Sequence, residues 1–399
     1  MQTLCGLACL SLIVGCGGGG STAPVDSPQA IPAQAEAELS AVAAIGELLF
    51  HDAGLSASGQ VACDSCHAET AAHAQPQQPN PATAVPLGGT TANTQGFRNA
   101  PSLRYLRFNP AFYFDNDGVP TGGLNRDGRA DTLAAQARRP FLAPHEMANG
   151  AIGDVVAKLQ SASYVNRFTA VFGSAVFDDP AVAFERMLLA LQRYQLEARE
   201  FAPFDSKFDY FLAGKARLSA PELRGLALYN NPAKGNCAAC HPSTRAPDGT
   251  PPLFTDFTYD TLGVPRNLDI AANADPDYFD LGLCGPDRTD LADRPALCGA
   301  FKVPSLRNVA LTAPYFHNGR FQSLREVLGF YVRRDTNPEE WYPEGGARLF
   351  DDLPVQHLRN VNRSEPPYDR GPGDLPALAD REIDDVIAFL NTLTDGYLQ

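Results

Sequence analysis

The stretches of sequence that decide the fold are Cys63-Asp64-Ser65-Cys66-His67 and Cys237-Ala238-Ala239-Cys240-His241, two copies of the motif C-x-x-C-H. This motif attaches haem c: its two thiols add to the two vinyl groups of one porphyrin, and the histidine that follows binds the iron. In 399 residues with 9 Cys and 7 His, chance predicts roughly 0.004 copies. A zinc site would need further Cys/His pairs nearby, and a redox dithiol would not need a histidine after both motifs. We therefore expect two covalent c-type haems.

The segments around the motifs have helical periodicity. Apolar residues recur on one face in 36–50, 181–200 and 380–393, and Ser219 with Glu222 forms a capping box ahead of another helix. Helix, C-x-x-C-H, loop and closing helix is the plan of a cytochrome c domain. The expected fold is mainly α: two cytochrome c-like haem domains packed together, with little β structure and long ordered loops. We place these domains at 36–205 and 206–399.

Composition and charge exclude two other classes of protein. The chain has 32 Lys and Arg against 46 Asp and Glu, a net charge of −14. This acidity argues against nucleic-acid binding, which needs a basic face. After residue 20 no apolar run reaches the ~18 residues that a membrane helix needs, so a polytopic membrane protein is excluded.

The N-terminus is typical of an exported protein. Residues 1–15 are mostly apolar and contain no acid, which predicts a signal peptide. They end in Ile13-Val14-Gly15-Cys16, which resembles the lipobox of bacterial lipoproteins and predicts lipidation of Cys16. Residues 16–35 are rich in Gly, Ser, Pro and Ala and predict a tether. We expect a periplasmic protein of a Gram-negative bacterium that meets the outer membrane through this lipid alone.

The sequence offers several side chains for the far face of each iron. No methionine follows Met187, so the second haem has no Met ligand within its own domain, and His317, His357, Tyr331 or an open position remain. For the first haem the candidates are Met147, His73, His145 or an open position. A carrier haem is usually six-coordinate, whereas a catalytic haem keeps one position open.

Four further segments carry a family resemblance. They are 301–308 (FKVPSLRN), 311–319 (LTAPYFHNG), 98–101 (RNAP) and 127–130 (DGRA). In order and spacing they resemble the bacterial di-haem cytochrome c peroxidases over most of residues 40–395. The resemblance implies a peroxidatic haem in the N-terminal domain and an electron-transfer haem in the C-terminal one.

The resemblance also implies roles for individual residues. Tyr331 matches the sixth-ligand position of the second haem, which is usually Met in the peroxidases and Tyr in the MauG branch. Gln136 and Glu146 match the distal glutamine and glutamate of the peroxidatic haem. Inactive peroxidases place a removable distal histidine where this chain has Thr90 and Thr91, so we expect a five-coordinate first haem. We expect His73, in a loop rich in Pro and Gln, to be exposed.

Asn99, Thr312 and Pro314 match the calcium site of the family, where one side-chain amide and two backbone carbonyls bind the ion. One position departs from the family. It often places a tryptophan between the haems, just before Asp-Gly-Arg, and here that residue is Arg126.

Two insertions remain. The first contains Cys284 and Cys298, and in an oxidising compartment we expect these two cysteines to form a disulfide. It would close a loop of ~15 residues, worth ~3 kcal/mol by chain entropy. The second, 335–374, is expected to be an ordered surface excursion beside Tyr331, either a partner-facing element or a plain long loop.

The function that these features favour is reduction of hydrogen peroxide at the first haem, with the second haem passing or storing oxidising equivalents. The electrons would come from a small cytochrome c or a cupredoxin. The alternative is oxidative modification of aromatic residues in a partner protein, as in the MauG branch. A third reading is a non-enzymatic, lipid-tethered electron carrier.

Overall fold

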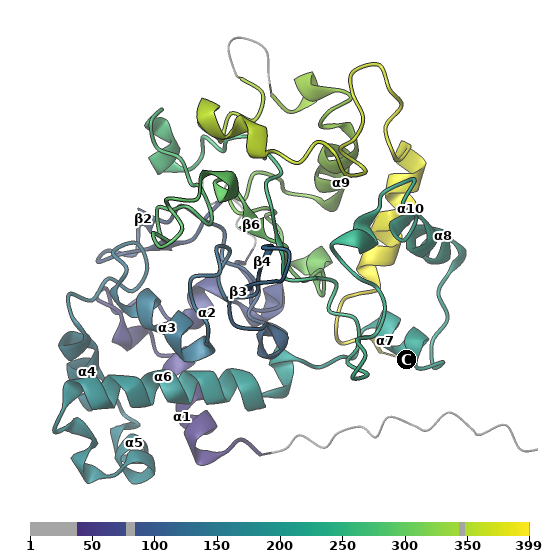
Figure 1. The fold of residues 1–399 in the computed structure, drawn as a ribbon. Coiled ribbons are helices and arrows are strands. Elements are labelled where there is room, and N and C mark those ends of the chain that lie inside the picture. Colours follow the sequence, from purple (N-terminus) through teal and green to yellow (C-terminus); the bar gives the residue numbers. More distant parts are fainter. Residues whose placement is uncertain (1–37, 77–83, 343–347, 399) are drawn as a thin grey trace, which may run out of the picture. The chain divides into compact units, whose positions relative to one another are not determined.

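The computed structural model describes residues 38–76, 84–342 and 348–398. The predicted signal peptide, the tether and Cys16 lie outside these residues. The described chain is mainly helical, as Figure 1 shows, and this confirms the expected fold class. Its α-helices are α1 Ala41–Phe50, α2 Cys63–Cys66, α3 Leu133–Leu142, α4 Ile152–Gln160, α5 Val165–Phe172, α6 Pro180–Glu197, α7 Lys207–Leu212, α8 Ala220–Tyr229, α9 Leu324–Arg333 and α10 Asp380–Asn391.

The strands are short and pair two by two. They form the antiparallel pairs β1 Leu87–Gly88 with β2 Thr94–Gln95, β3 Tyr113–Phe114 with β4 Pro120–Thr121, and β5 Tyr259–Asp260 with β6 Phe301–Lys302. Each strand has two residues, and long ordered loops connect the helices.

The first core lies where α1 packs on α6. The Ser40 hydroxyl accepts the Ala43 N–H at 3.2 Å and begins α1, while Asp179 caps α6 ahead of a proline at its first position. The two helices approach closely at Gly46, where a Cβ would lie 2.0 Å from the carbonyl oxygen of Ala190. Apolar residues of α3 and α4 complete this core. Its buried residues lie between positions 45 and 201.

The second core repeats this arrangement with α8 and α10, which lie side by side in Figure 1. The capping box of Ser219 and Glu222 is present at the start of α8, as expected. Gly225 marks the close approach, because a Cβ there would lie 1.9 Å from the carbonyl oxygen of Asp385. This core draws its residues from 208–393.

The cores are in keeping with the division into 36–205 and 206–399, which stays a prediction. Contacts group Glu36–Gln399 into one unit. Backbone hydrogen bonds join the two parts: the Asn99 N–H donates to the His317 carbonyl at 2.7 Å, and the Lys302 N–H donates to the Arg126 carbonyl at 2.9 Å.

The structure contains a disulfide between Cys284 and Cys298. The described residues of the insertion at 335–374 are mostly exposed or half-buried, but a few of its apolar side chains reach the interior. Tyr342, Phe350 and Leu353 lie in an apolar cluster with residues of α9, and Tyr368 stacks at 5.9 Å from Tyr331. Among the described residues, no helix is long and apolar enough to cross a membrane.

Candidate functional site

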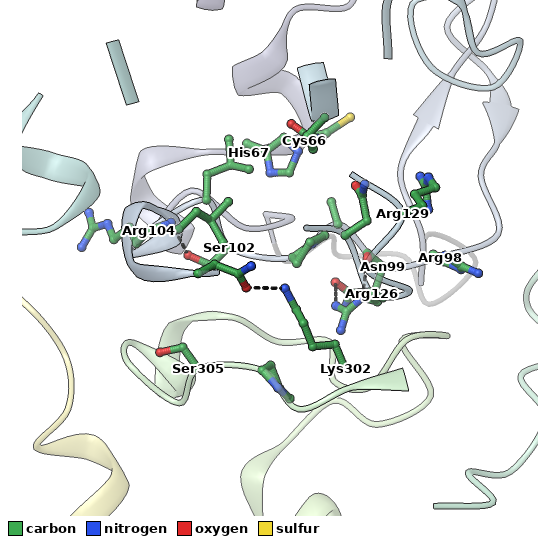
Figure 2. A pocket seen from close by; sticks show the side chains of 18 of the residues that line it. Cys66, His67, Arg98, Asn99, Ser102, Arg104, Arg126, Arg129, Lys302 and Ser305 are labelled. Atoms are coloured by element: carbon green, nitrogen blue, oxygen red, sulfur yellow. Dashed lines mark hydrogen bonds between the residues drawn. The ribbon is translucent and has the colours of Figure 1, made fainter. Parts of the chain in front are cut away.

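Two cavities of nearly equal volume, about 210 and about 200 Å³, each contain one C-x-x-C-H motif in their walls. The first cavity is lined by Cys66 and His67, and Figure 2 shows both at its rim. The second cavity is lined by Cys237, Cys240 and His241. Both cavities have mainly apolar walls, as expected for a porphyrin pocket.

The first motif is held by a short helix. Cys63 and Cys66 stand on α2, and His67 ends it with its N–H on the Cys63 carbonyl at 2.9 Å. The His67 Nδ1 lies 3.1 Å from the His73 carbonyl, to which it donates. Burial lowers the pKa of His67, which favours the neutral imidazole. With the proton on Nδ1, Nε2 is free to bind a metal.

The second motif repeats this geometry. His241 follows the 3₁₀ turn Cys237–Ala239, and its N–H donates to the Cys237 carbonyl at 2.8 Å. Its Nδ1 donates to the Phe254 carbonyl at 2.8 Å, and burial lowers its pKa. The Tyr229 hydroxyl holds the His241 carbonyl at 2.6 Å. In both motifs, burial thus favours the neutral imidazole, and a backbone carbonyl orients the ring through Nδ1.

The four motif cysteines take no part in the disulfide of the structure. Burial raises the pKa of each of them to about 12, so they are protonated at neutral pH. Each motif supplies the two thiols and the imidazole that covalent haem attachment uses, whereas a structural zinc site needs four Cys or His ligands together. The described residues also hold no cluster of three or more His, Cys, Asp or Glu suited to a metal ion. The residues present fit haem c.

Glu146 lies in the wall of the first cavity with His67. It follows α3, and its backbone carbonyl accepts the Gly89 N–H at 2.7 Å. A Cβ on Gly88 would lie 2.5 Å from that same carbonyl oxygen, so glycine permits the close approach. The Glu146 side chain is 33% exposed.

Burial raises the pKa of Glu146, against the opposing charges of Arg139 and Arg129. Asp287 pairs with both arginines, at 3.4 Å from Arg129, and so weakens their effect. A carboxyl group with a raised pKa exchanges protons more readily near neutral pH. Glu146 therefore has the properties of a general base and acid.

The other side chains that were expected near the first haem lie in or beside the first cavity. Gln136, on α3, and His145 line the first cavity. His145 Nε2 lies 3.7 Å from the Glu146 carboxylate. Met147 is buried in the first core and lines a smaller cavity of about 60 Å³ next to the motif.

The expectation that His73 is exposed is wrong, because the side chain is only 3% exposed. Its ring packs at 4.5 Å from the ring of Phe201, and its Nδ1 accepts the Arg104 Nε–H at 3.4 Å. These partners are distant in sequence. His73 acts through its backbone carbonyl, which orients His67.

Tyr331 lines the second cavity with His241. It stands on α9, which the Ser323 and Glu326 capping box begins, and its ring stacks at 5.8 Å from that of Phe316. Burial raises its pKa, and the negative charge of Asp260 adds to the rise. A buried phenol of this kind loses its proton only beside a cation.

The other two candidate ligands of the second haem, His317 and His357, lie in different surroundings. His317 also lines the second cavity, but its ring stacks flat on Phe301 at 3.7 Å and its Nε2 lies 3.3 Å from Asp352. His357, in the 3₁₀ segment Val355–Asn360, is absent from the described lining of this cavity.

The predicted calcium ligands lie together, but protein donors already satisfy two of them. The Asn99 side-chain amide donates to the Pro314 carbonyl. Arg126 donates to the Asn99 side-chain oxygen and to its carbonyl, at 2.9 Å each. Thr312 lies two residues before Pro314. A guanidinium on the Asn99 oxygen repels a divalent cation, so these residues fit calcium poorly.

Sequence reasoning missed the wall that the two cavities share. Among the described residues, four line both cavities: Arg126, Lys302, Val303 and Pro304. Lys302 lies within the 301–308 segment that carries the family resemblance. A lysine between Phe301 and Val303, in an otherwise apolar strand, is the signal that could have found it.

Comparisons with known proteins agree with this geometry. Residues 40–217 match the family model of the di-haem cytochrome c peroxidases. The methylamine utilization protein MauG of Paracoccus denitrificans is 36% identical over 380 residues, which are 92% of each chain. The cytochrome c peroxidase Ccp of Escherichia coli is 27% identical over 86% of this chain and 61% of that protein.

Solved structures give the same result. The di-haem peroxidase BthA of Burkholderia thailandensis superposes with a TM-score of 0.81 at 39% identity, over 91% of this chain and 88% of that one. A MauG-like protein associated with microbial copper homeostasis matches with a TM-score of 0.63 at 28% identity, over 90% and 91%. The chain therefore belongs to the di-haem cytochrome c peroxidase and MauG family, oxidoreductases that carry two c-type haems.

Proposed function

We propose that the chain reduces hydrogen peroxide in the first cavity and that the second centre, with Tyr331 as a ligand, passes or stores oxidising equivalents. Haem, bound through Cys63, Cys66 and His67 and through Cys237, Cys240 and His241, supplies the redox chemistry in both cavities. The observation that carries the proposal is the placement of His67, Gln136 and Glu146 in the walls of one cavity.

The Glu146 carboxylate moves the proton. It accepts a proton from one peroxide oxygen and delivers it to the other, so that the oxygen–oxygen bond breaks with water as the leaving group. Two electrons and two protons in all convert one peroxide into two waters. The Gln136 amide orients the reacting oxygens by hydrogen bonding. Acid–base help of this kind is worth ~10²–10⁴ in rate.

Tyr331 sets the character of the second centre. Its phenolate is an anionic, hard ligand, which favours the oxidised state of the metal it binds. The raised pKa of Tyr331 means that the bound cation must stabilise this phenolate. His241, which donates from Nδ1 to the Phe254 carbonyl, would be the other protein ligand of the group held in this cavity. Such a centre would be suited to storing oxidising equivalents as well as passing them on.

The same feature favours a second candidate function, the oxidation of aromatic side chains in a partner protein. A tyrosine in the second cavity and 36% identity to a MauG protein support it. Membership in a family of oxidoreductases counts against the electron-carrier alternative. The electron donor that we propose for peroxide reduction is a small cytochrome c or cupredoxin, and the proposed location is the periplasm, with a lipid on Cys16.

The calcium ion stays a prediction. Because Arg126 and Asn99 already satisfy the oxygens concerned, we derive no step through calcium. Elemental analysis of the purified protein, before and after dialysis against a chelator, decides whether Asn99, Thr312 and Pro314 hold one.

Replacing Glu146 by Gln tests the proposed proton transfer. Glu146→Gln keeps the size of the side chain and removes its ability to take a proton, so turnover of peroxide with reduced cytochrome c should fall by ~10²–10⁴. Both haems should remain attached in the absorption spectrum. The control is Glu185→Gln, an acid 57% exposed on α6 that lines neither cavity. Equal activity of the two variants would refute the role of Glu146.

Spectroscopy separates the remaining alternatives. Electron paramagnetic resonance of the oxidised protein should show one high-spin and one low-spin haem, since the first has an open position. Two low-spin signals would indicate an electron carrier instead. Rapid steady-state turnover with reduced cytochrome c supports peroxide reduction, and its absence in a protein that still reacts with peroxide favours partner oxidation.

A further inference from the structure

Two positively charged side chains stand in the wall between the two cavities. Arg126 and Lys302 each line both of them, and the Lys302 N–H bonds the Arg126 carbonyl at 2.9 Å. Figure 2 shows Lys302 reaching from its strand into the first cavity, toward the side that carries Ser102, Asn99 and Arg126. We call Arg126 and Lys302 the cationic wall.

Both side chains of the cationic wall donate hydrogen bonds to uncharged oxygen atoms. The Lys302 Nζ donates to the Asn109 side-chain oxygen at 2.8 Å and to the Gly123 carbonyl at 2.6 Å. Arg126 donates to the two oxygens of Asn99. Within the described residues, neither side chain forms a salt bridge.

The nearest carboxylates are already engaged elsewhere. Arg98 holds Asp127 and Asp280 at 2.6 Å each, and Arg129 holds Asp127 at 2.7 Å. Neither member of the cationic wall therefore has an ion-pair partner among the described residues. Charges removed from water are costly unless they are paired, and burial lowers the pKa of Lys302 to about 7, which expresses this cost.

The chemistry of the group expected in each cavity supplies the missing anions. Haem c is attached through its vinyl groups and carries two propionate carboxylates elsewhere on the ring. Cys66 lines the first cavity with the cationic wall, and Cys237 and Cys240 line the second with it. A propionate can thus meet Arg126 or Lys302 from either side.

We infer that Arg126 and Lys302 bind haem propionates from both cavities and, as one shared electrostatic element, raise the reduction potentials of both haems. The inference rests on the proposed occupation of both cavities by haem. Positive charge beside an iron centre favours the form that has gained an electron. Because the same two charges line both cavities, removing either one should lower both potentials.

This role gives Arg126 a function other than the one its position has in the family. A guanidinium is not readily oxidised, so Arg126 does not replace a tryptophan as a stepping stone for electrons. It acts on both centres through its charge. The cationic wall would then influence both reduction potentials electrostatically, and no aromatic side chain at position 126 would connect the haems.

The test is a spectroelectrochemical titration of the full-length, haem-loaded protein. In Lys302→Met, the midpoint potentials of both haems should fall by at least the equivalent of a tenfold change in the reduction equilibrium, about 59 mV for a one-electron couple. Arg126→Gln should lower both in the same way, and Lys302→Arg should restore them. The control is Lys158→Met, since Lys158, on α4, donates to the neutral side-chain oxygen of Asn149 and lines neither cavity.

Unchanged potentials in Lys302→Met and Arg126→Gln overturn the inference, and so does an equal fall in the control. If the midpoint potential falls for only one haem, the claim that the cationic wall acts on both haems is wrong. Should Lys302→Met fail to fold, Lys302→Gln keeps a hydrogen-bond donor without the charge and is measured instead. The titration needs no peroxide, so a protein without peroxidase activity but with both potentials lowered refutes the proposed function and leaves this inference standing.

Discussion

Gly225 should tolerate no side chain, because α8 and α10 touch there. A Cβ at this position would lie 1.9 Å from the Asp385 carbonyl oxygen and 2.9 Å from the Phe389 Cβ. Ordinary contact begins near 3.4 Å, so Gly225→Ala requires the helices to separate by about 1.5 Å. A gap of that size forfeits much of the dispersion energy between the packed side chains.

The expected destabilisation is therefore large. Overpacking costs ~1–3 kcal/mol, and here the blocking atom belongs to the backbone and cannot rotate away, so we expect the upper end, about 3 kcal/mol. The better helix propensity of alanine recovers at most ~1 kcal/mol. For a part of ~150–250 residues, each kcal/mol corresponds to about 2–4 °C in Tm, so Tm should fall by roughly 4–12 °C.

A matched glycine gives the control. Gly153 lies in α4, and a Cβ there meets nothing within 4 Å, so Gly153→Ala should leave Tm unchanged or raise it. Thermal unfolding followed by helical circular dichroism measures both variants with the haems attached. Equal Tm values for Gly225→Ala and Gly153→Ala would show that the helices do not meet as described. Because α8 leads into the second motif, Gly225→Ala should also broaden the spectrum of the second haem.

Three further changes have defined outcomes. Arg139→Gln removes a charge that lowers the pKa of Glu146, so the acid limb of the pH profile of kcat/KM should move to higher pH; a limb that stays in place contradicts the proposed base. Tyr331→Met replaces an anionic ligand by a neutral one and should raise the potential of the second haem, which an electrochemical titration detects. Changing Cys284 and Cys298 together to Ser should lower the free energy of unfolding by ~3 kcal/mol, measured by urea titration, and a loss below ~0.5 kcal/mol would mean that the loop is held by other contacts.

The parts of the site that rest on local chemistry could be predicted from the sequence. Two thiols and an imidazole at fixed spacing on one porphyrin require C-x-x-C-H, and the motif is the same wherever it occurs. Helix starts are also local: the Ser219 and Glu222 capping box needs three residues of separation and nothing else. Gln136 and Glu146 were predicted from the family resemblance, and the structure places both in the first cavity.

Features that depend on distant partners could not be predicted. His73 lies in a polar loop, yet it is buried against Arg104 and Phe201. Neither contact can be predicted from the residues next to His73 in the sequence. The insertion at 335–374 has the composition of a surface loop but contributes Tyr368 to the wall of the second cavity. In both cases the chain returns to the haem pocket from a separate segment.

The two halves hold their haems alike and differ in what faces them. In each, a short helical turn carries the cysteines, a backbone carbonyl orients the histidine, and a helix pair crosses at a glycine. The opposite walls are unlike: a carboxyl and an amide in the first cavity, a tyrosine in the second. Similar supports for the two motif histidines are thus combined with different opposite walls, and the cationic wall of Arg126 and Lys302 lines both cavities. Since these two side chains line both cavities, a change at this wall should move both potentials together, whereas Tyr331 lines the second cavity alone and can set the two potentials apart.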